Sequence, residues 1–268
     1  MKIEKDSSGR RSVELELEVP GTPEEVWRAI ATGPGISSWF VPTTVECDDR
    51  APVAVTSTFG PGLQVRSDVT QWNPTRQFAV QGQSWGGAPP IAIEWNIEAR
   101  SGDVCVVRVV NSLFASTDEW DDQLEGAASA WLGFFRTLSI YLTHFPGQRS
   151  ALLQFVVPVP GSEAQAWDTL TAALGVEGLL VGDAWAAPAG APALKGVAEY
   201  MSRDPYDALI RLDEPAAGVA ALGAFELGGQ SMVAFNLYQY GDLAQVRAEQ
   251  LTPAWQAWID QRFPAQQP

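Results

Sequence analysis

Charged side chains inside apolar, strand-like segments are the first candidates for chemistry. Arg66, Asp68, Glu94 and Arg108 all stand among apolar neighbours. Successive side chains of a strand point to opposite faces, and these four fall out of phase with the larger apolar set, so we expect most of them to face solvent. Arg108 is kept as a ligand-binding candidate, because an inward-pointing guanidinium would pair with a carboxylate.

The other reactive residue types form no catalytic or metal-binding set. His144 is the only histidine, and no nucleophile or carboxylate is spaced to serve it. The spacing of Cys47 and Cys105 fits neither a metal site nor a disulfide framework, so we expect two buried, reduced thiols. Phosphate-binding loops, G-x-S-x-G, H-E-x-x-H and C-x-x-C do not occur. We therefore predict no catalytic residue, no metal and no cofactor.

Aromatic residues are the more informative group, with 11 Trp, 11 Phe and 5 Tyr. An apolar pocket with a few polar groups is the usual small-molecule site, and the alternative is that the rings simply fill a core. The candidate cavity-wall residues of the first half are Trp39, Phe40, Phe59, Trp72, Trp85, Trp95, Phe114, Trp131, Phe134 and Phe135. Those assigned to ligand binding, with Arg108, are Trp39, Phe40, Phe59, Trp72, Trp95, Trp131 and Phe135. The loop from Trp85 to Pro90 is either a lid over the cavity or a long hairpin turn.

Composition limits the class of protein. Of 268 residues, 46% are hydrophobic and 18% charged, which is enough apolar material for packed cores. The formal charge of −15 disfavours binding to nucleic acid or to an anionic membrane surface. Because the N-terminus has no signal-peptide pattern and no apolar run is long enough to span a bilayer, we expect a cytoplasmic protein.

An internal repeat organises the chain. Val19-Pro20-Gly21-Thr22 recurs 140 residues later as Val159-Pro160-Gly161-Ser162, each followed by a tryptophan, Trp27 or Trp167. Each motif leads from an alternating strand into a helix with a capping box, formed by Thr22 and Glu25 or by Ser162 and Gln165. Near the two ends the offset is 124, so the second copy is shorter by about 16 residues. We predict two related domains, 1–147 and 148–268.

Each copy has the same predicted order of elements: a strand, short helices, a meander of strands and a long C-terminal helix. A capping box of Ser116 and Glu119 is expected to begin the first long helix. In the second copy Pro253 predicts a break into helices 242–250 and 253–262. The expected strands are 12–19, 43–47, 51–59, 64–72, 76–83, 91–99 and 103–112, then 151–157, 193–201, 205–213, 217–226 and 231–240.

Two segments carry a family resemblance. Val19-Pro20-Gly21-Thr22-Pro23-Glu24-Glu25-Val26-Trp27 and Gly35-Ile36-Ser37-Ser38-Trp39-Phe40 resemble the opening of SRPBCC (START and birch-pollen-allergen-like) proteins. The nearest branch is that named after the activator of the heat-shock ninety-kilodalton chaperone ATPase. The resemblance implies an α+β helix-grip fold in each domain, a curved antiparallel sheet wrapped on a long C-terminal helix with an apolar cavity between them.

Three functions remain open, because this fold serves many. The first is non-catalytic binding of an apolar small molecule of lipid, sterol or polyketide type. The second is a protein-interaction role, with a chaperone or other ATPase as partner. The third is a cyclase, hydrolase or lyase, which would need at least two polar side chains converging in the cavity. The sequence leaves the ligand and the oligomeric state undetermined.

Overall fold

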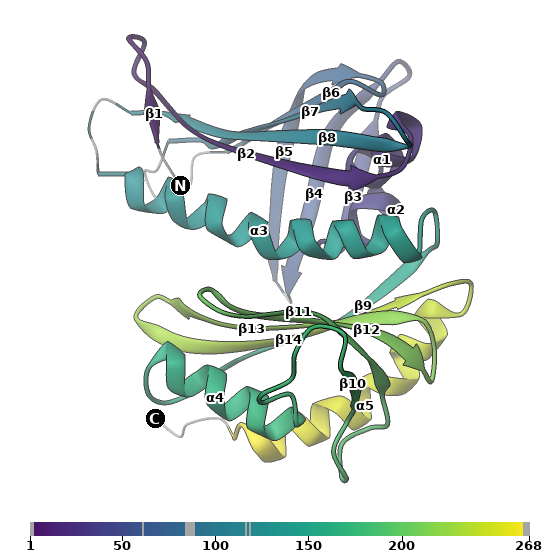
Figure 1. Ribbon diagram of the computed structural model, residues 1–268. Coiled ribbons are helices and arrows are strands. Elements are labelled where there is room, and N and C mark those ends of the chain that lie inside the picture. The colour runs from purple at the N-terminus through teal and green to yellow at the C-terminus, as the bar shows by residue number, and fades with distance from the viewer. Residues whose placement is uncertain (1–2, 61, 84–88, 116, 118, 265–268) are drawn as a thin grey trace. The chain divides into compact units, whose positions relative to one another are not determined.

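The protein is described by a computed structural model covering residues 3–60, 62–83, 89–115, 117 and 119–264, without the side chains of 122, 123 and 125–130. The chain forms two compact units, Met1–Gly147 and Gln148–Pro268. Each unit has its own antiparallel sheet (Figure 1).

Unit 1 is a curved antiparallel sheet wrapped on one long helix, α3 (Asp121–His144). The sheet has the strand order β1-β2-β8-β7-β6-β5-β4-β3. β2 and β8 lie along α3, whereas β4 and β5 cross it, so the sheet has a concave side (Figure 1). The strands are β1 (Glu4–Lys5), β2 (Arg10–Pro20), β3 (Thr43–Cys47), β4 (Pro52–Gly60), β5 (Leu63–Asn73), β6 (Gln77–Gly82), β7 (Ala92–Ala99) and β8 (Val104–Phe114).

Two short helices, α1 (Pro23–Ala31) and α2 (Gly33–Ile36), link β2 to β3. The predicted capping box is confirmed: the Thr22 hydroxyl accepts from the Glu25 amide and the Glu25 carboxylate from the Thr22 amide. At Gly35 an added Cβ would lie 1.9 Å from the Arg28 carbonyl oxygen. Glycine is therefore required for α2 to fold back against α1, which brings the following aromatic pair, Trp39-Phe40, under the sheet.

The start of α3 differs from the prediction. Ser116 lies outside the described residues, and the helix begins at Asp121 with Trp120 at the N-cap and no side-chain cap. Instead, the Asp121 carboxylate pairs with Arg11 at 2.6 Å and with Lys5 at 2.9 Å. Arg11 is itself buried. The first turn of α3 is thus joined to β1 and β2 by ion pairs, and the carboxylate also suits the positive end of the helix dipole.

Unit 2 has the sheet order β10-β11-β12-β13-β14-β9, with both of its helices, α4 and α5, on one face (Figure 1). The second predicted capping box, Ser162 with Gln165, is confirmed at the start of α4. β10 was not predicted. The elements are β9 (Ser150–Pro158), α4 (Glu163–Leu174), β10 (Ala184–Ala186), β11 (Lys195–Arg203), β12 (Tyr206–Glu214), β13 (Gly218–Leu227), β14 (Gln230–Tyr240) and α5 (Ala244–Arg262).

The predicted break at Pro253 is wrong, because α5 continues through it. Proline removes the hydrogen bond to the carbonyl of Glu249, and both residues are on the exposed side of the helix, where water can satisfy that carbonyl. Trp255, Trp258 and Ile259 are buried on the other side. The packing of that apolar face outweighs the local penalty and holds the helix in one piece.

Candidate functional site

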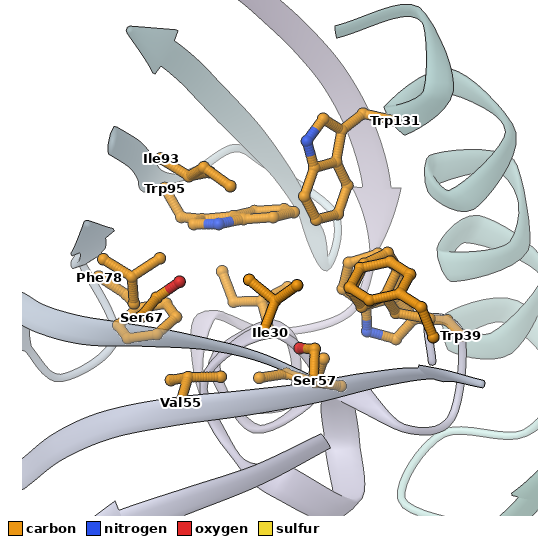
Figure 2. A pocket seen from close by; sticks show the side chains of 14 residues that line it. Ile30, Trp39, Val55, Ser57, Ser67, Phe78, Ile93, Trp95 and Trp131 are labelled. Atoms are coloured by element: carbon orange, nitrogen blue, oxygen red, sulfur yellow. The ribbon is translucent and has the colours of Figure 1, made fainter. Parts of the chain in front are cut away.

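Unit 1 contains a cavity of about 120 Å³ on the concave side of its sheet (Figure 2). Strands β4 to β7 form one wall of the cavity. A second wall is formed by α1, α2 and the segment that follows them, and a third by Trp131 of α3. Val65 faces the cavity yet is 42% exposed, so solvent reaches this wall. The lining residues are Ile30, Ile36, Trp39, Phe40, Val55, Ser57, Phe59, Val65, Ser67, Phe78, Val80, Ile93, Trp95 and Trp131.

The alternation of β7 explains why aromatic rings gather here. Ile93 and Trp95 are two residues apart and therefore point to the same face, which is the concave one. Trp39 meets Trp95 from the opposite side at 5.8 Å between ring centroids. The Trp39 indole Nε1 donates to the Ala29 carbonyl at 2.9 Å, which fixes the ring and satisfies its buried polar atom.

Trp131 is the contribution of α3 to this cluster. Its ring stacks on Phe40 at 4.9 Å with a 22° interplanar angle, and on Phe135 at 5.7 Å with 23°. It meets Trp95 edge to face at 5.4 Å. Figure 2 shows Trp131 and Trp95 on the same side of the cavity, with Trp39 across from Trp131. Each of these rings is held by at least two others, so the wall is preorganised.

The polar part of the lining is two serines. Ser57 on β4 and Ser67 on β5 carry their hydroxyls at the cavity wall, and the Ser57 hydroxyl shares a hydrogen bond of 3.0 Å with Thr43 Oγ1. Among the described lining residues there is no titratable side chain. The site can therefore offer an apolar surface and weak hydroxyl contacts, but its described lining presents no acid–base pair.

The structure brings most of the predicted site residues together. Trp39, Phe40, Phe59, Trp95 and Trp131 line the cavity. Phe135 is buried behind them and touches the rings of Trp39, Trp95 and Trp131. Phe134 packs on Phe40 at 4.6 Å without lining the cavity.

Two aromatic predictions fall elsewhere, and a third concerns a residue that the structure does not describe. Trp72 packs against Trp27 at 4.8 Å and Phe78 at 5.4 Å; it is paired with Phe78 in the sheet and so lies beside this lining residue, without lining the cavity itself. The prediction that Phe114 lines the cavity is wrong. Its side chain is 59% exposed, because the preceding residue, Leu113, points inward and successive strand residues point to opposite faces. Trp85, with the rest of its loop up to residue 88, lies outside the described residues.

The charged strand residues lie away from the cavity. Arg108 pairs with Glu14 at 3.0 Å and Glu16 at 3.3 Å, two residues of β2 that share its exposed face. The inward orientation that a carboxylate-binding role would require is not adopted. Arg66 similarly bonds to Glu46 and Asp68 at the surface.

The two cysteines have different environments. Cys105 is buried, as expected, and its thiol donates to the Gly21 carbonyl at 3.3 Å. Burial raises the pKa of the Cys105 thiol, with a smaller contribution from Glu24 and Glu25, so it remains protonated and weakly nucleophilic. Cys47 is exposed, contrary to expectation, since it ends the edge strand β3.

No group of three or more metal-ligating side chains occurs in the described part of the chain. Nor does any helix in that part have the length and apolar character needed to cross a bilayer.

Sequence reasoning missed the aliphatic and polar members of the lining. Ile30, Val55 and Val80 are ordinary core residues by type, and nothing in the pattern marked them as cavity walls. Ser57 and Ser67 could have been noticed as inward-facing polar positions, since both alternate with charged or polar neighbours. Asn111 is a further polar residue facing inward, marked by a different signal: the positions two residues away on its own face of β8, Val109 and Leu113, are apolar.

The corresponding region of unit 2 is filled. Its cavity measures about 10 Å³ and is lined by Phe155, Val157, Leu170, Val233, Phe235, Trp258, Ile259 and Phe263. Trp255, at the place in α5 that matches Trp131 in α3, is 0% exposed and packs on Phe235 at 4.5 Å. A volume of that size holds at most one water molecule.

Comparison with known proteins gives fold-level likenesses only. No protein-family model matches the chain, and no curated protein matches it. Among solved structures, the di-domain ARO/CYC BexL from the BE-7585A biosynthetic pathway is similar over 96% of this chain and 100% of its own, at 14% identity and a TM-score of 0.45.

DynU16, a protein in the dynemicin biosynthetic locus, is similar over 93% of this chain and 98% of its own, at 16% identity and a TM-score of 0.41. The Aha1 dimer from Colwellia psychrerythraea covers 49% of this chain and 96% of its own, at 18% identity and a TM-score of 0.38. At such identities and TM-scores, no activity is inferred from these likenesses.

Proposed function

We propose that unit 1 binds an uncharged, apolar small molecule in the aromatic cavity and catalyses no reaction on it. The observation that carries this proposal is the lining itself: preorganised rings around an open volume, with two serines as its polar side chains. Charged ligands are disfavoured, because a buried ion needs a partner charge or several hydrogen bonds. The motifs from Val19 to Trp27 and from Gly35 to Phe40 support membership of the SRPBCC superfamily.

The volume favours small ligands within the lipid, sterol and polyketide types. Typical small-molecule sites measure roughly 300–1,000 Å³, and an apolar cavity of about 150 Å³ accepts benzene. At about 120 Å³, the cavity suits one ring, or two fused rings if Val65 at the open wall moves aside. A sterol would require a larger rearrangement of α3 against the sheet.

The lining gives little support to a cyclase, hydrolase or lyase. General acid–base catalysis needs groups with a pKa near the working pH, held within hydrogen-bond reach of the reacting atoms. A serine hydroxyl without an adjacent base does not meet that need, and Ser57 is already engaged with Thr43.

The test is a thermal-shift screen of fatty acids, sterols and aromatic polyketides, extended to one-ring and two-ring aromatic compounds. A ligand at a hundredfold excess over its dissociation constant stabilises the folded protein by about 2.7 kcal/mol, which raises the melting temperature measurably. We expect small neutral aromatics to produce the largest shift and their carboxylate derivatives to produce none. The proposal would be refuted if only the carboxylates shifted the melting temperature, or if no compound did.

A further inference from the structure

One buried polar side chain on the concave side of unit 1 makes no hydrogen bond with the residues that the structure describes. Asn111 of β8 is 0% exposed. Among the residues that the structure describes, neither its Nδ2 nor its Oδ1 has a hydrogen-bond partner. An amide left unpaired in a protein interior costs free energy, and native proteins contain few such groups. Valine or leucine would suit a buried strand position better.

The sheet register places this amide beside the cavity. Asn111 is directly opposite Ile93 of β7 on one side and Val13 of β2 on the other. Residues opposite each other in a ladder share a face, so Asn111 points to the same concave side as Ile93, which lines the cavity. Trp95, which pairs with Val109, is its diagonal neighbour and also lines the cavity.

The chemistry of the amide defines what it would recognise. A carboxamide offers two N–H donors and a carbonyl acceptor, and carries no charge. A ligand hydroxyl can both accept and donate, and a ligand carbonyl can accept, so either would satisfy atoms that are now unpaired. A charged group would bring a desolvation cost that one amide does not offset.

We propose that Asn111 is the specificity-determining residue of the cavity, recognising a neutral hydroxyl or carbonyl group on an otherwise apolar ring ligand. This inference rests on the proposed function of unit 1. The ring occupies the aromatic cavity, and its oxygen substituent extends past Ile93 to the amide. Asn111 thereby weakens the empty protein and strengthens the complex with an oxygenated ligand.

Unit 2 supplies a matched control. Gln239 of β14 is also 0% exposed, and in the described residues both of its side-chain amide atoms lack a partner. It lies two residues from Leu237, on the helix-facing side of its sheet, where the nearby cavity is about 10 Å³ and does not include it. Leucine at either position removes an unpaired amide, but only position 111 adjoins a cavity of useful size.

The experiment compares 2-naphthol with naphthalene as probes of the full-length protein, by fluorescence titration. For the wild type we expect 2-naphthol to be favoured, and Asn111→Leu should reduce the ratio of the two affinities roughly tenfold while naphthalene binding is kept. The melting temperature of unliganded Asn111→Leu should rise. Gln239→Leu should raise the melting temperature and leave the affinity ratio unchanged. Asn111→Val is the second variant, should leucine overfill the site.

The outcomes separate the inference from the function beneath it. An unchanged ratio in both Asn111 variants, with both probes still bound, would overturn the role of Asn111 and leave the cavity's function intact. A lower melting temperature for both variants would show that the amide is satisfied in the empty protein, by an internal water for example, and would overturn the inference as well. Failure of the wild type to bind either probe would overturn the proposed function and the inference together.

Discussion

A tryptophan occupies the matching position of the last helix in both units, and its surroundings differ. Trp131 stacks on Phe40 and Phe135 and borders an open volume. Trp255 is fully buried, packs on Phe235 and Trp258, and leaves almost no volume beside it. The same residue type therefore acts as a cavity wall in one copy and as core filling in the other.

Alanine at these two positions should separate ligand binding from stability. Trp131→Ala removes a wall of the cavity and two stacking partners, so we expect 2-naphthol to bind about tenfold more weakly or worse. Trp255→Ala should cost about 3–5 kcal/mol of unfolding free energy, as for other buried tryptophans, and change the probe affinity by less than about twofold. Urea unfolding and fluorescence titration of both variants provide the measurements. Equal losses of affinity would contradict the assignment of the cavity to unit 1.

At the scale of elements, the first turn of α3 is held by charge rather than by a side-chain cap. Asp121 joins the helix to Arg11 of β2 and to Lys5 of β1. The hydrogen bond from Lys5, then that from Arg11, lowers the pKa of the Asp121 carboxyl below its ordinary value. Because α3 carries Trp131 into the cavity wall, the ion pairs at Asp121 help to position the site although they lie outside it.

The ion pairs predict an acid-sensitive step. A carboxyl whose folded pKa is depressed stabilises the protein above its unfolded pKa, and that contribution is lost as the pH falls through the folded value. We expect the melting temperature to fall as the pH drops below about 4, the ordinary pKa of an aspartate, and Asp121→Asn to lower it at neutral pH while reducing this acid-dependent fall. Asp48→Asn is the comparison variant: hydrogen bonds from the Ala51 and Arg50 amides also lower the pKa of that carboxyl, so it too should reduce the acid-dependent fall, but asparagine can still accept both bonds and should leave the melting temperature at neutral pH unchanged. An acid profile for Asp121→Asn that parallels the wild type would contradict the role of the ion pairs.

At the scale of the whole molecule, the two units have the same order of elements but different interiors. Between its short helices and its long helix, unit 1 has one more strand than unit 2 in the described residues. Unit 1 encloses a cavity, whereas the described residues of unit 2 form a continuous apolar core. The proposed function therefore assigns binding to one unit only.

Hydrogen exchange tests that division of roles. With 2-naphthol at a hundredfold excess over its dissociation constant, exchange of globally protected amides in unit 1 should slow by up to about a hundredfold. Strands β4 to β7 and the second half of α3 should show the effect, and residues 148–268 should show none. Trp131→Ala, treated in the same way, is the control. Equal protection of both units would refute the assignment.

Local patterns in the sequence were sufficient for the longer strands, though not for the short β1 and β10, and for the starts of α1 and α4. Alternating apolar residues mark a strand wherever one face is buried, and a capping box involves residues only three apart, as at Thr22 and Ser162. Pro253 misled for the same reason: its penalty is local, but the burial of Trp255 and Trp258 that overrides it comes from residues far away in the chain.

The sequence by itself determined the α+β class, the repeat and the inward direction of residues such as Trp95. Only the tertiary structure decided which inward rings border a cavity and which fill a core. A period of two sets the face to which a side chain points, but it does not set the distance between sheet and helix. That distance depends on the sizes of all facing side chains together, and it separates Trp131 beside an open volume from Trp255 in a closed one.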